Sequence, residues 1–149
     1  MISDEKWMKI ALNQAILAEL DGEVPVGAVL VKNNILIAQA FNQPIAKNDV
    51  TAHAEIQVLR IAGQAESNYR LNNTSLYVTL EPCLMCLGAI MQARISRLIF
   101  GAYETNSDLC VSCENLNNSN FFNHNINITG GILENESKQL LKSFFKLRR

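Results

Sequence analysis

Four side chains in two short clusters carry the chemistry that this sequence can offer, His53 with Glu55 and Cys83 with Cys86. Cys83 and Cys86 are three residues apart, so on a helix they share one face and can bind the same ion. We predict Pro82 at the first helical position, which places both thiols in the first turn, where unpaired N–H groups and the helix dipole favour thiolates. The imidazole of His53 then completes a nitrogen and sulfur ligand set that suits zinc.

Three protein ligands are typical of a catalytic zinc site, because they leave the fourth tetrahedral position to water. Zinc lowers the pKa of such a water to about 7, so hydroxide is available at neutral pH. Glu55 follows His53 by two residues at a helix entrance, so one side chain can bind the metal while the other reaches the water. We therefore predict one Zn²⁺ per chain, with Glu55 as the catalytic proton carrier.

Each of these residues also has a simpler interpretation. A single C-x-x-C is weak support for a metal, since buried cysteines are common, and a single histidine is usually a hydrogen-bonded core residue. The combination of H-A-E with P-C-x-x-C after a strand is far more specific. A second pair, Cys110 and Cys113, has neither this framing nor a nearby base, and His124 is the only other histidine. We expect that pair to be two free cysteines in or near a loop, without a second zinc.

Hydrophobic spacing predicts the elements that position these residues. Apolar side chains recur at helical spacing from an N-cap at Ser3 to Asp21-Gly22, and again from Thr51 to Gly63. A third helix follows Pro82. Residues 115–127 contain seven asparagines and predict mostly loop, with a short strand near Ile126 and Ile128 and a last helix after Gly130-Gly131. The predicted strands are residues 26–31, 35–40, 75–80 and 97–100, the first two joined through Lys32-Asn33-Asn34. This alternation indicates one α/β domain over residues 1–149, in which an initial hairpin makes the sheet mixed.

Composition excludes several classes of protein. A hydrophobic fraction of 48% and a charged fraction of 18% exclude a disordered chain, and four cysteines in 149 residues are too few for a disulfide scaffold. The chain starts with acids, and no apolar run reaches the roughly 18 residues of a membrane span, so we expect a cytoplasmic protein without a membrane partner. The net charge of −1 hides polarity, since residues 138–149 hold five of the 13 basic residues and no acid. The other eight basic and all 14 acidic residues lie in residues 1–137, which therefore carry a net charge of −6, against +5 for residues 138–149.

The sequence resembles the bacterial tRNA adenosine deaminase family of the zinc-dependent cytidine deaminase superfamily, whose signature is H-x-E with P-C-x-x-C. The resemblance covers nearly the whole chain and is strongest before Gly101. It is carried by residues 23–29 (EVPVGAV), 42–45 (NQPI), 51–55 (TAHAE), 76–83 (LYVTLEPC), and Phe144-Phe145 near Arg148-Arg149. It implies a three-layer α/β/α cytidine-deaminase-like fold, with helices on both faces of a central mixed sheet.

The same resemblance implies hydrolysis of adenosine to inosine at the wobble position of a tRNA anticodon, with release of ammonia. Zinc would be held by His53, Cys83 and Cys86. Glu55 would take a proton from the water that attacks C6 and deliver protons to the ring and to ammonia. Asn42 would orient the flipped nucleoside, although by itself it reads as a turn residue, and the Ala54 N–H would bond within the site. Family members are homodimers whose RNA site spans both subunits, so a homodimer that binds an anticodon stem-loop is expected.

The chain departs from the family pattern after Gly101-Ala102, where an acid, a lysine and small residues usually form part of the RNA-facing wall. Glu104 can replace the acid, but the lysine and the small residues are missing. Cations near the end of the chain compensate in part for this lost RNA contact, with Phe145 as an aromatic contact; they are Lys138, Lys142, Lys146, Arg148 and Arg149. The alternative is that these cations only cap the last helix and form its solvated face. Two alternatives stay open. One is a deaminase of a free base or nucleoside of guanine or cytosine type, and the other is a non-catalytic, zinc-stabilised binding module.

Overall fold

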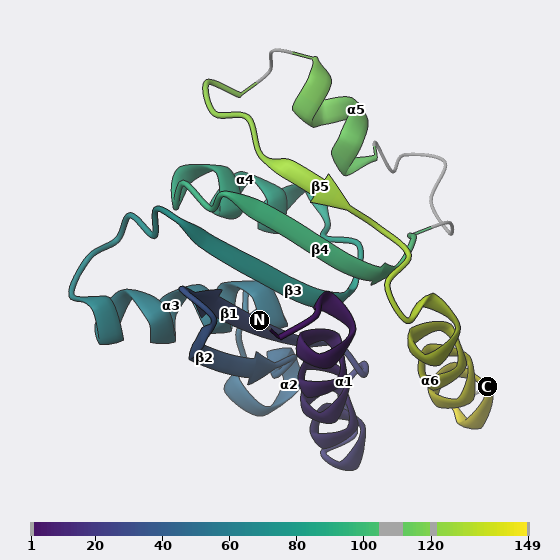
Figure 1. Cartoon of the computed structure of the whole chain (residues 1–149). Helices are drawn as coiled ribbons and strands as arrows, with labels where there is room; N and C mark the ends of the chain where they lie inside the picture. Colours follow the sequence, from purple (N-terminus) through teal and green to yellow (C-terminus); the bar gives the residue numbers. More distant parts are fainter. Residues whose placement is uncertain (1, 105–111, 120–121, 149) are drawn as a thin grey trace.

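The computed structural model describes residues 2–104, 112–119 and 122–148, which form five strands and six helices (Figure 1). The strands are β1 (Gly27–Lys32), β2 (Ile35–Phe41), β3 (Thr74–Leu80), β4 (Arg97–Ala102) and β5 (Asn127–Thr129). The helices are α1 (Asp4–Leu20), α2 (Pro44–Lys47), α3 (Ala54–Glu66), α4 (Leu84–Gln92), α5 (Cys113–Asn118) and α6 (Glu134–Leu147). No helix among the described residues has the length and apolar character needed to cross a membrane.

The five strands form one mixed sheet in the order β2-β1-β3-β4-β5. The β1–β2 and β1–β3 pairs are antiparallel, whereas β3–β4 and β4–β5 are parallel. The initial hairpin turns at Asn33 and Asn34, which both have positive φ angles, a backbone state that asparagine tolerates well. The predicted hairpin and the mixed sheet are both confirmed.

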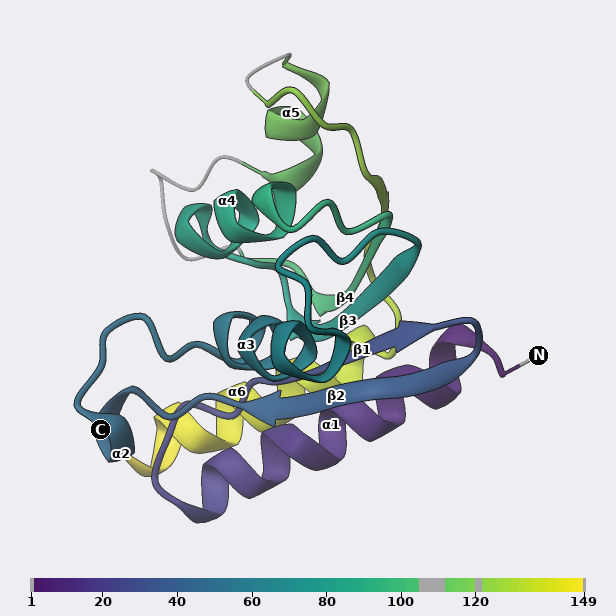
Figure 2. The ribbon, with the colours of Figure 1, turned by 90° about the vertical axis from the view of Figure 1, so that its left-hand side faces the viewer.

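Alternate residues of the central strands pack on opposite faces of this sheet. Leu30, Leu76 and Leu98 belong to the core under α3 and α4, while Val29 and Tyr77 pack with Trp7 and Met8 of α1. Figure 2 shows α1 and α6 on one face of the sheet and α3 and α4 on the other. Because both faces of the strands are buried, the fold has three layers, as the resemblance implies.

Strand direction brings three chain segments to one edge of the sheet. Since β2 and β3 are both antiparallel to β1, they run in the same direction, and β4 is parallel to β3. The C-terminal ends of all three therefore lie at the same edge. Asn42 follows β2 there, Pro82 and Cys83 follow β3, and Glu104 comes shortly after β4. This edge is where a site can form from residues that are distant in sequence.

Three predicted helix boundaries are wrong. The helix expected from Thr51 begins at Ala54, after residues 51–53, and continues past Gly63 to Glu66, because Ser67 supplies the left-handed residue that ends it. Pro82 is not the first helical residue. It precedes Cys83, which is the N-cap of α4.

Two short helices were not predicted. α2 begins at Pro44 after β2, and α5 lies partly in the asparagine-rich stretch expected to be loop. The side chain of Ser112 caps α5 by accepting the N–H of Asn115. The amide of Asn117 then bonds both the N–H and the carbonyl of Ile126, which ties the helix to the chain leading into β5. Of the strand predicted near Ile126 and Ile128, β5 contains only the latter.

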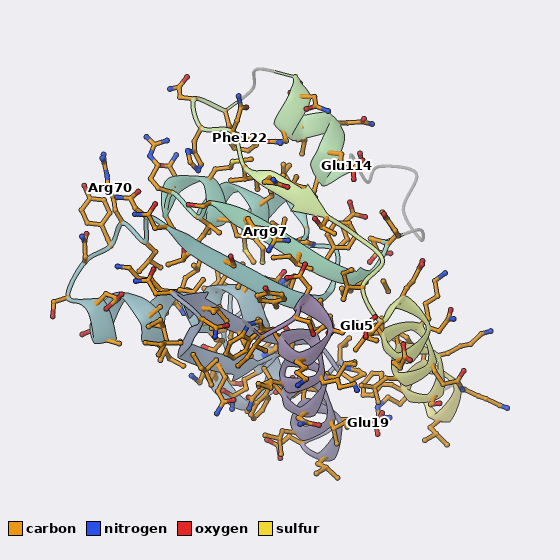
Figure 3. The ribbon with its side chains drawn as sticks, viewed as in Figure 1. Glu5, Glu19, Arg70, Arg97, Glu114 and Phe122 are labelled. Carbon is orange, nitrogen blue, oxygen red and sulfur yellow. The ribbon has the colours of Figure 1, made fainter. Side chains whose placement is uncertain are left out.

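The first turn of α1 is fastened to the sheet by Asp4, which accepts bonds from Tyr77 and from Arg97, labelled in Figure 3. The Arg97 bond holds the pKa of Asp4 below its ordinary value. Ionised Asp4 therefore stabilises the fold above its unfolded pKa, and this contribution disappears as the pH falls through the folded pKa. Asp4→Asn should lower the free energy of unfolding by about 0.5–1 kcal/mol near pH 7, because the pair is partly exposed and screened. Urea denaturation should show no difference near about pH 2, and a difference that persisted there would contradict this role.

Candidate metal centre

His53, Cys83 and Cys86 converge at the sheet edge in a geometry that fits one metal ion. The Nδ1 atom of His53 lies 3.7 Å from the Cys83 Sγ and 3.5 Å from the Cys86 Sγ, and all three donor atoms lie within 4.8 Å of one another. Tetrahedral zinc with bonds of about 2.3 Å to sulfur and 2.0–2.1 Å to nitrogen requires nitrogen–sulfur separations of about 3.6 Å. The donor types and their spacing therefore match zinc without rearrangement.

Two helix entrances hold these ligands. His53 is the N-cap of α3, and Cys83 is the N-cap of α4, with Cys86 in its first turn. Both caps have extended backbone conformations, so their side chains project at the ends of the helices. Although Pro82 is not itself helical, the unpaired N–H groups of the α4 N-terminus still favour negative charge on sulfur.

The pKa values of the two thiols are shifted in opposite directions. A hydrogen bond from Cys86 lowers the pKa of Cys83 to about 4, against the effect of burial, and His53 acts in the same direction. The same bond raises the pKa of Cys86 well above its ordinary value. The hydrogen bond with Cys83 also raises the pKa of His53. The cluster thus presents a thiolate at neutral pH, which is the form that binds metal.

Glu55 lies beside this cluster and is buried, with 4% of its surface exposed. Burial is the main cause that raises the pKa of its carboxyl group to about 7, and the nearby charge of Cys83 acts in the same direction. A carboxyl group with a pKa near neutrality can both accept and return a proton, which is the property required of a general acid and base.

Asn42 and Ala54 lie next to the metal ligands and are joined to each other. The Oδ1 atom of buried Asn42 accepts the backbone N–H of Ala54 at 2.7 Å. This bond links the end of β2 to the start of α3. The side-chain amide nitrogen of Asn42 makes no hydrogen bond to the described residues, so its donors are available to a ligand. The sequence placed both residues in the site but did not predict that they bind each other.

Glu23 is a buried acid near this site that sequence patterns did not indicate as a site residue. Glu23 is 1% exposed, and its two carboxylate oxygens accept the N–H groups of Ile45 and Ala46 at the start of α2. It thereby fixes the segment that follows Asn42. The sequence signal for this role was an acid in an otherwise apolar stretch (EVPVGAV), since a carboxylate that is buried there requires hydrogen-bond partners.

The second cysteine pair contributes no ligand cluster within the described part of the chain. Cys113 is buried, and its thiol lies 3.4 Å from the Pro82 carbonyl oxygen, to which it donates, while Cys110 lies outside the described residues. The Nε2 atom of His124 lies 2.8 Å from the Ile95 carbonyl oxygen. Across residues 2–104, 112–119 and 122–148, one group of three metal-binding side chains is present, formed by His53, Cys83 and Cys86.

The predicted RNA contacts fall into two places. Glu104 follows β4 near the metal centre, while Phe145, Lys146 and Arg148 lie at the exposed end of α6. Phe145 is 45% exposed. The Arg148 guanidinium stacks 3.6 Å from the Phe144 ring centroid and donates to the Phe144 carbonyl, so this cation also caps α6. Arg149 lies outside the described residues.

Comparisons with known proteins place the chain in a family. A model of MafB19-like deaminases matches residues 2–149. A tRNA-specific adenosine deaminase of Buchnera aphidicola subsp. Baizongia pistaciae is 51% identical over 99% of this chain and 91% of its own length. The chain belongs to the tRNA-specific adenosine deaminase family. The family member from Haemophilus influenzae is 46% identical over 98% of this chain and 85% of its own. A solved structure from work on A-to-I editing by tRNA:A34 deaminases at the wobble position superposes with a TM-score of 0.86 and 42% identity, covering 91% of this chain and 99% of that one.

Proposed function

We propose that the chain hydrolyses adenosine to inosine and ammonia at the wobble position of a tRNA anticodon. The observation that carries this proposal is a buried carboxyl group, Glu55, beside a His-Cys-Cys group that could hold one metal ion, in a chain 51% identical to a tRNA-specific adenosine deaminase. The open coordination position implied by three ligands distinguishes this arrangement from a structural zinc site. A single deaminase domain spans residues 1–149.

Each site residue has a defined task in this reaction. His53, Cys83 and Cys86 would hold the zinc ion, which when bound would supply the charge that lowers the pKa of water toward about 7. Glu55 accepts a proton from the water that attacks C6 of adenine and gives it to the ring nitrogen. It then takes the remaining proton of the hydroxyl added at C6 and gives it to the departing ammonia as the C6 carbonyl forms. Asn42 orients the nucleoside, with its Oδ1 fixed by the Ala54 N–H and its amide donors turned to substrate.

The assembly that we propose is a homodimer with one Zn²⁺ per chain, in which an anticodon stem-loop contacts both subunits. Glu104, Phe145, Lys146, Arg148 and Arg149 are the proposed RNA contacts. Because the proposed substrate is a tRNA, we also propose that the enzyme acts in the cytoplasm. The changed sequence after Gly101-Ala102 favours a second candidate, a deaminase of a free base, because such a substrate needs no RNA-facing wall.

Ammonia release from parallel substrates tests the function. Purified, zinc-loaded protein is given an anticodon stem-loop with a wobble adenosine, the same stem-loop with wobble guanosine, free guanine and free cytosine. We expect ammonia only from the first, together with inosine in the digested RNA. Activity on a free base alone would replace the proposal by the second candidate, and inactivity on all substrates would favour a zinc-stabilised module.

Truncation of residues 146–149 should weaken stem-loop binding more than it weakens the fold. The truncation removes three cations, and at about 0.1 M salt we expect RNA affinity to fall by about tenfold or more, with a shallower dependence on salt. Fluorescence anisotropy across a salt series measures both quantities, and thermal unfolding measures the loss of the Arg148 cap. Lys32→Gln is the matched control, because Lys32 lies outside α6, at the end of β1, where it is paired with Glu66. Equal affinity and an equal salt slope would remove the RNA role of these residues.

A further inference from the structure

The carboxylate of Glu81 joins three parts of the sheet edge that are distant in sequence. Glu81 directly precedes Pro82 and Cys83, and it is buried, with 5% of its surface exposed. Its Oε1 accepts the backbone N–H of Glu104 at 3.1 Å, and its Oε2 accepts that of Cys113 at 3.1 Å. Its own N–H donates to the Ala102 carbonyl at 2.8 Å. The segment that leaves β4 and the start of α5 therefore meet on one side chain beside a metal ligand.

The neighbouring contacts make this junction rigid. The Cys113 thiol bonds the carbonyl of Pro82, and Cys113 is part of the buried core. On the other arm, Tyr103 packs edge-on against Phe100, with ring centroids 4.9 Å apart. Both arms thus make further contacts, and the Glu81 side chain binds both of them.

A carboxylate is the group that this position requires. It offers one acceptor oxygen to each N–H, and bonds to a charged acceptor are stronger than neutral ones. No Lys or Arg of the described residues forms an ion pair with Glu81, so the two backbone N–H groups are what the carboxylate binds. An amide of the same size has one acceptor oxygen and would turn an NH₂ group toward an N–H donor.

We propose that Glu81 is a positioning residue that sets substrate affinity, because it fixes Glu104 relative to Cys83. This inference rests on the proposed function, in which Glu104 contacts RNA. Glu81 touches neither substrate nor metal. It holds the main chain of Glu104 through one bond, and the second bond, to Cys113, keeps the carboxylate in place.

The substitution Glu81→Gln tests this role in the full-length, zinc-loaded chain. We expect one zinc per chain, as in the parent, because all three ligands are unchanged. The KM for the anticodon stem-loop should rise at least about fivefold, while kcat per bound zinc stays within about twofold. In the Glu55→Ala background, the Kd for the same stem-loop, measured by anisotropy without turnover, should rise by a similar factor. A purely structural role would lower the active fraction and leave KM and Kd unchanged, and that result would overturn the inference.

Ser112→Ala is the matched control. It removes the cap of the same helix, α5, but leaves both bonds of Glu81 intact. We expect a comparable loss of thermal stability with KM unchanged, and an equal rise in KM would overturn the specific role of Glu81. The proposed function fails separately, when the parent chain neither binds nor deaminates the stem-loop. The positioning inference alone fails when the parent is active and Glu81→Gln binds RNA equally well.

Discussion

Replacing Glu55 by glutamine is expected to abolish deamination while the chain keeps its zinc and its fold. Glutamine has nearly the same size but cannot accept a proton or return it. The carboxyl of Glu55 is buried, and burial raises its pKa to about 7, so at neutral pH it can serve in both directions. General acid and base groups contribute about 10²–10⁴-fold to rate, and Glu55 serves in more than one proton transfer. We therefore expect kcat to fall by about 10³-fold or more.

Two measurements on the same preparation check this prediction, namely ammonia release and zinc content per chain. Glu66→Gln is the matched control, since Glu66 lies at the other end of α3 in a surface ion pair with Lys32. That variant should retain full activity. Turnover by Glu55→Gln at the parent rate would falsify the assignment. Loss of its zinc would instead show that Glu55 acts on the metal rather than on the proton.

The convergence of the three proposed metal ligands could be predicted from sequence because their signals are local. The spacing of Cys83 and Cys86 and the position of His53 before a helix are properties of a few consecutive residues. The error over Pro82 moved the helix start without changing which side chains meet, because a helix N-cap and the first turn project to the same region. The order of the strands then brings His53 and Cys83 together, although 30 residues separate them.

Contacts that depend on the sheet geometry could not be predicted in this way. The bond between Asn42 and Ala54 joins the end of β2 to the start of α3 across 12 residues, so its partners are set by the path of the chain between them and not by a sequence pattern. Glu23 and Glu81 are acids in largely apolar stretches, and their partners are backbone N–H groups whose residue types carry no signal. α2 and α5 are too short for hydrophobic periodicity, and each is supported by a side chain from elsewhere or by a cap.

Replacing Cys86 by serine should remove the zinc and with it all deaminase activity. Serine keeps the shape of the buried side chain but offers a hydroxyl, which is a poor ligand for zinc beside a thiolate and an imidazole. Loss of a residue that only supports a ligand typically costs about 10–100-fold in metal affinity, so loss of a ligand should cost more than about 100-fold. Because zinc binds the folded chain, its loss also removes stabilisation. Zinc should raise the melting temperature of the parent and leave that of Cys86→Ser unchanged.

Cys113→Ser separates the loss of a ligand from the loss of a buried thiol. Cys113 is also buried, and a serine hydroxyl can still donate to the Pro82 carbonyl, yet this residue is no part of the ligand cluster. The Cys113→Ser variant should retain one zinc per chain, the rise in melting temperature that zinc causes, and turnover. The double variant Cys110→Ser/Cys113→Ser should also retain its zinc. Two zinc ions per parent chain, or one zinc ion in Cys86→Ser, would contradict the proposed ligand set. In that set His53, Cys83 and Cys86 bind the zinc ion, and Cys110 and Cys113 bind none.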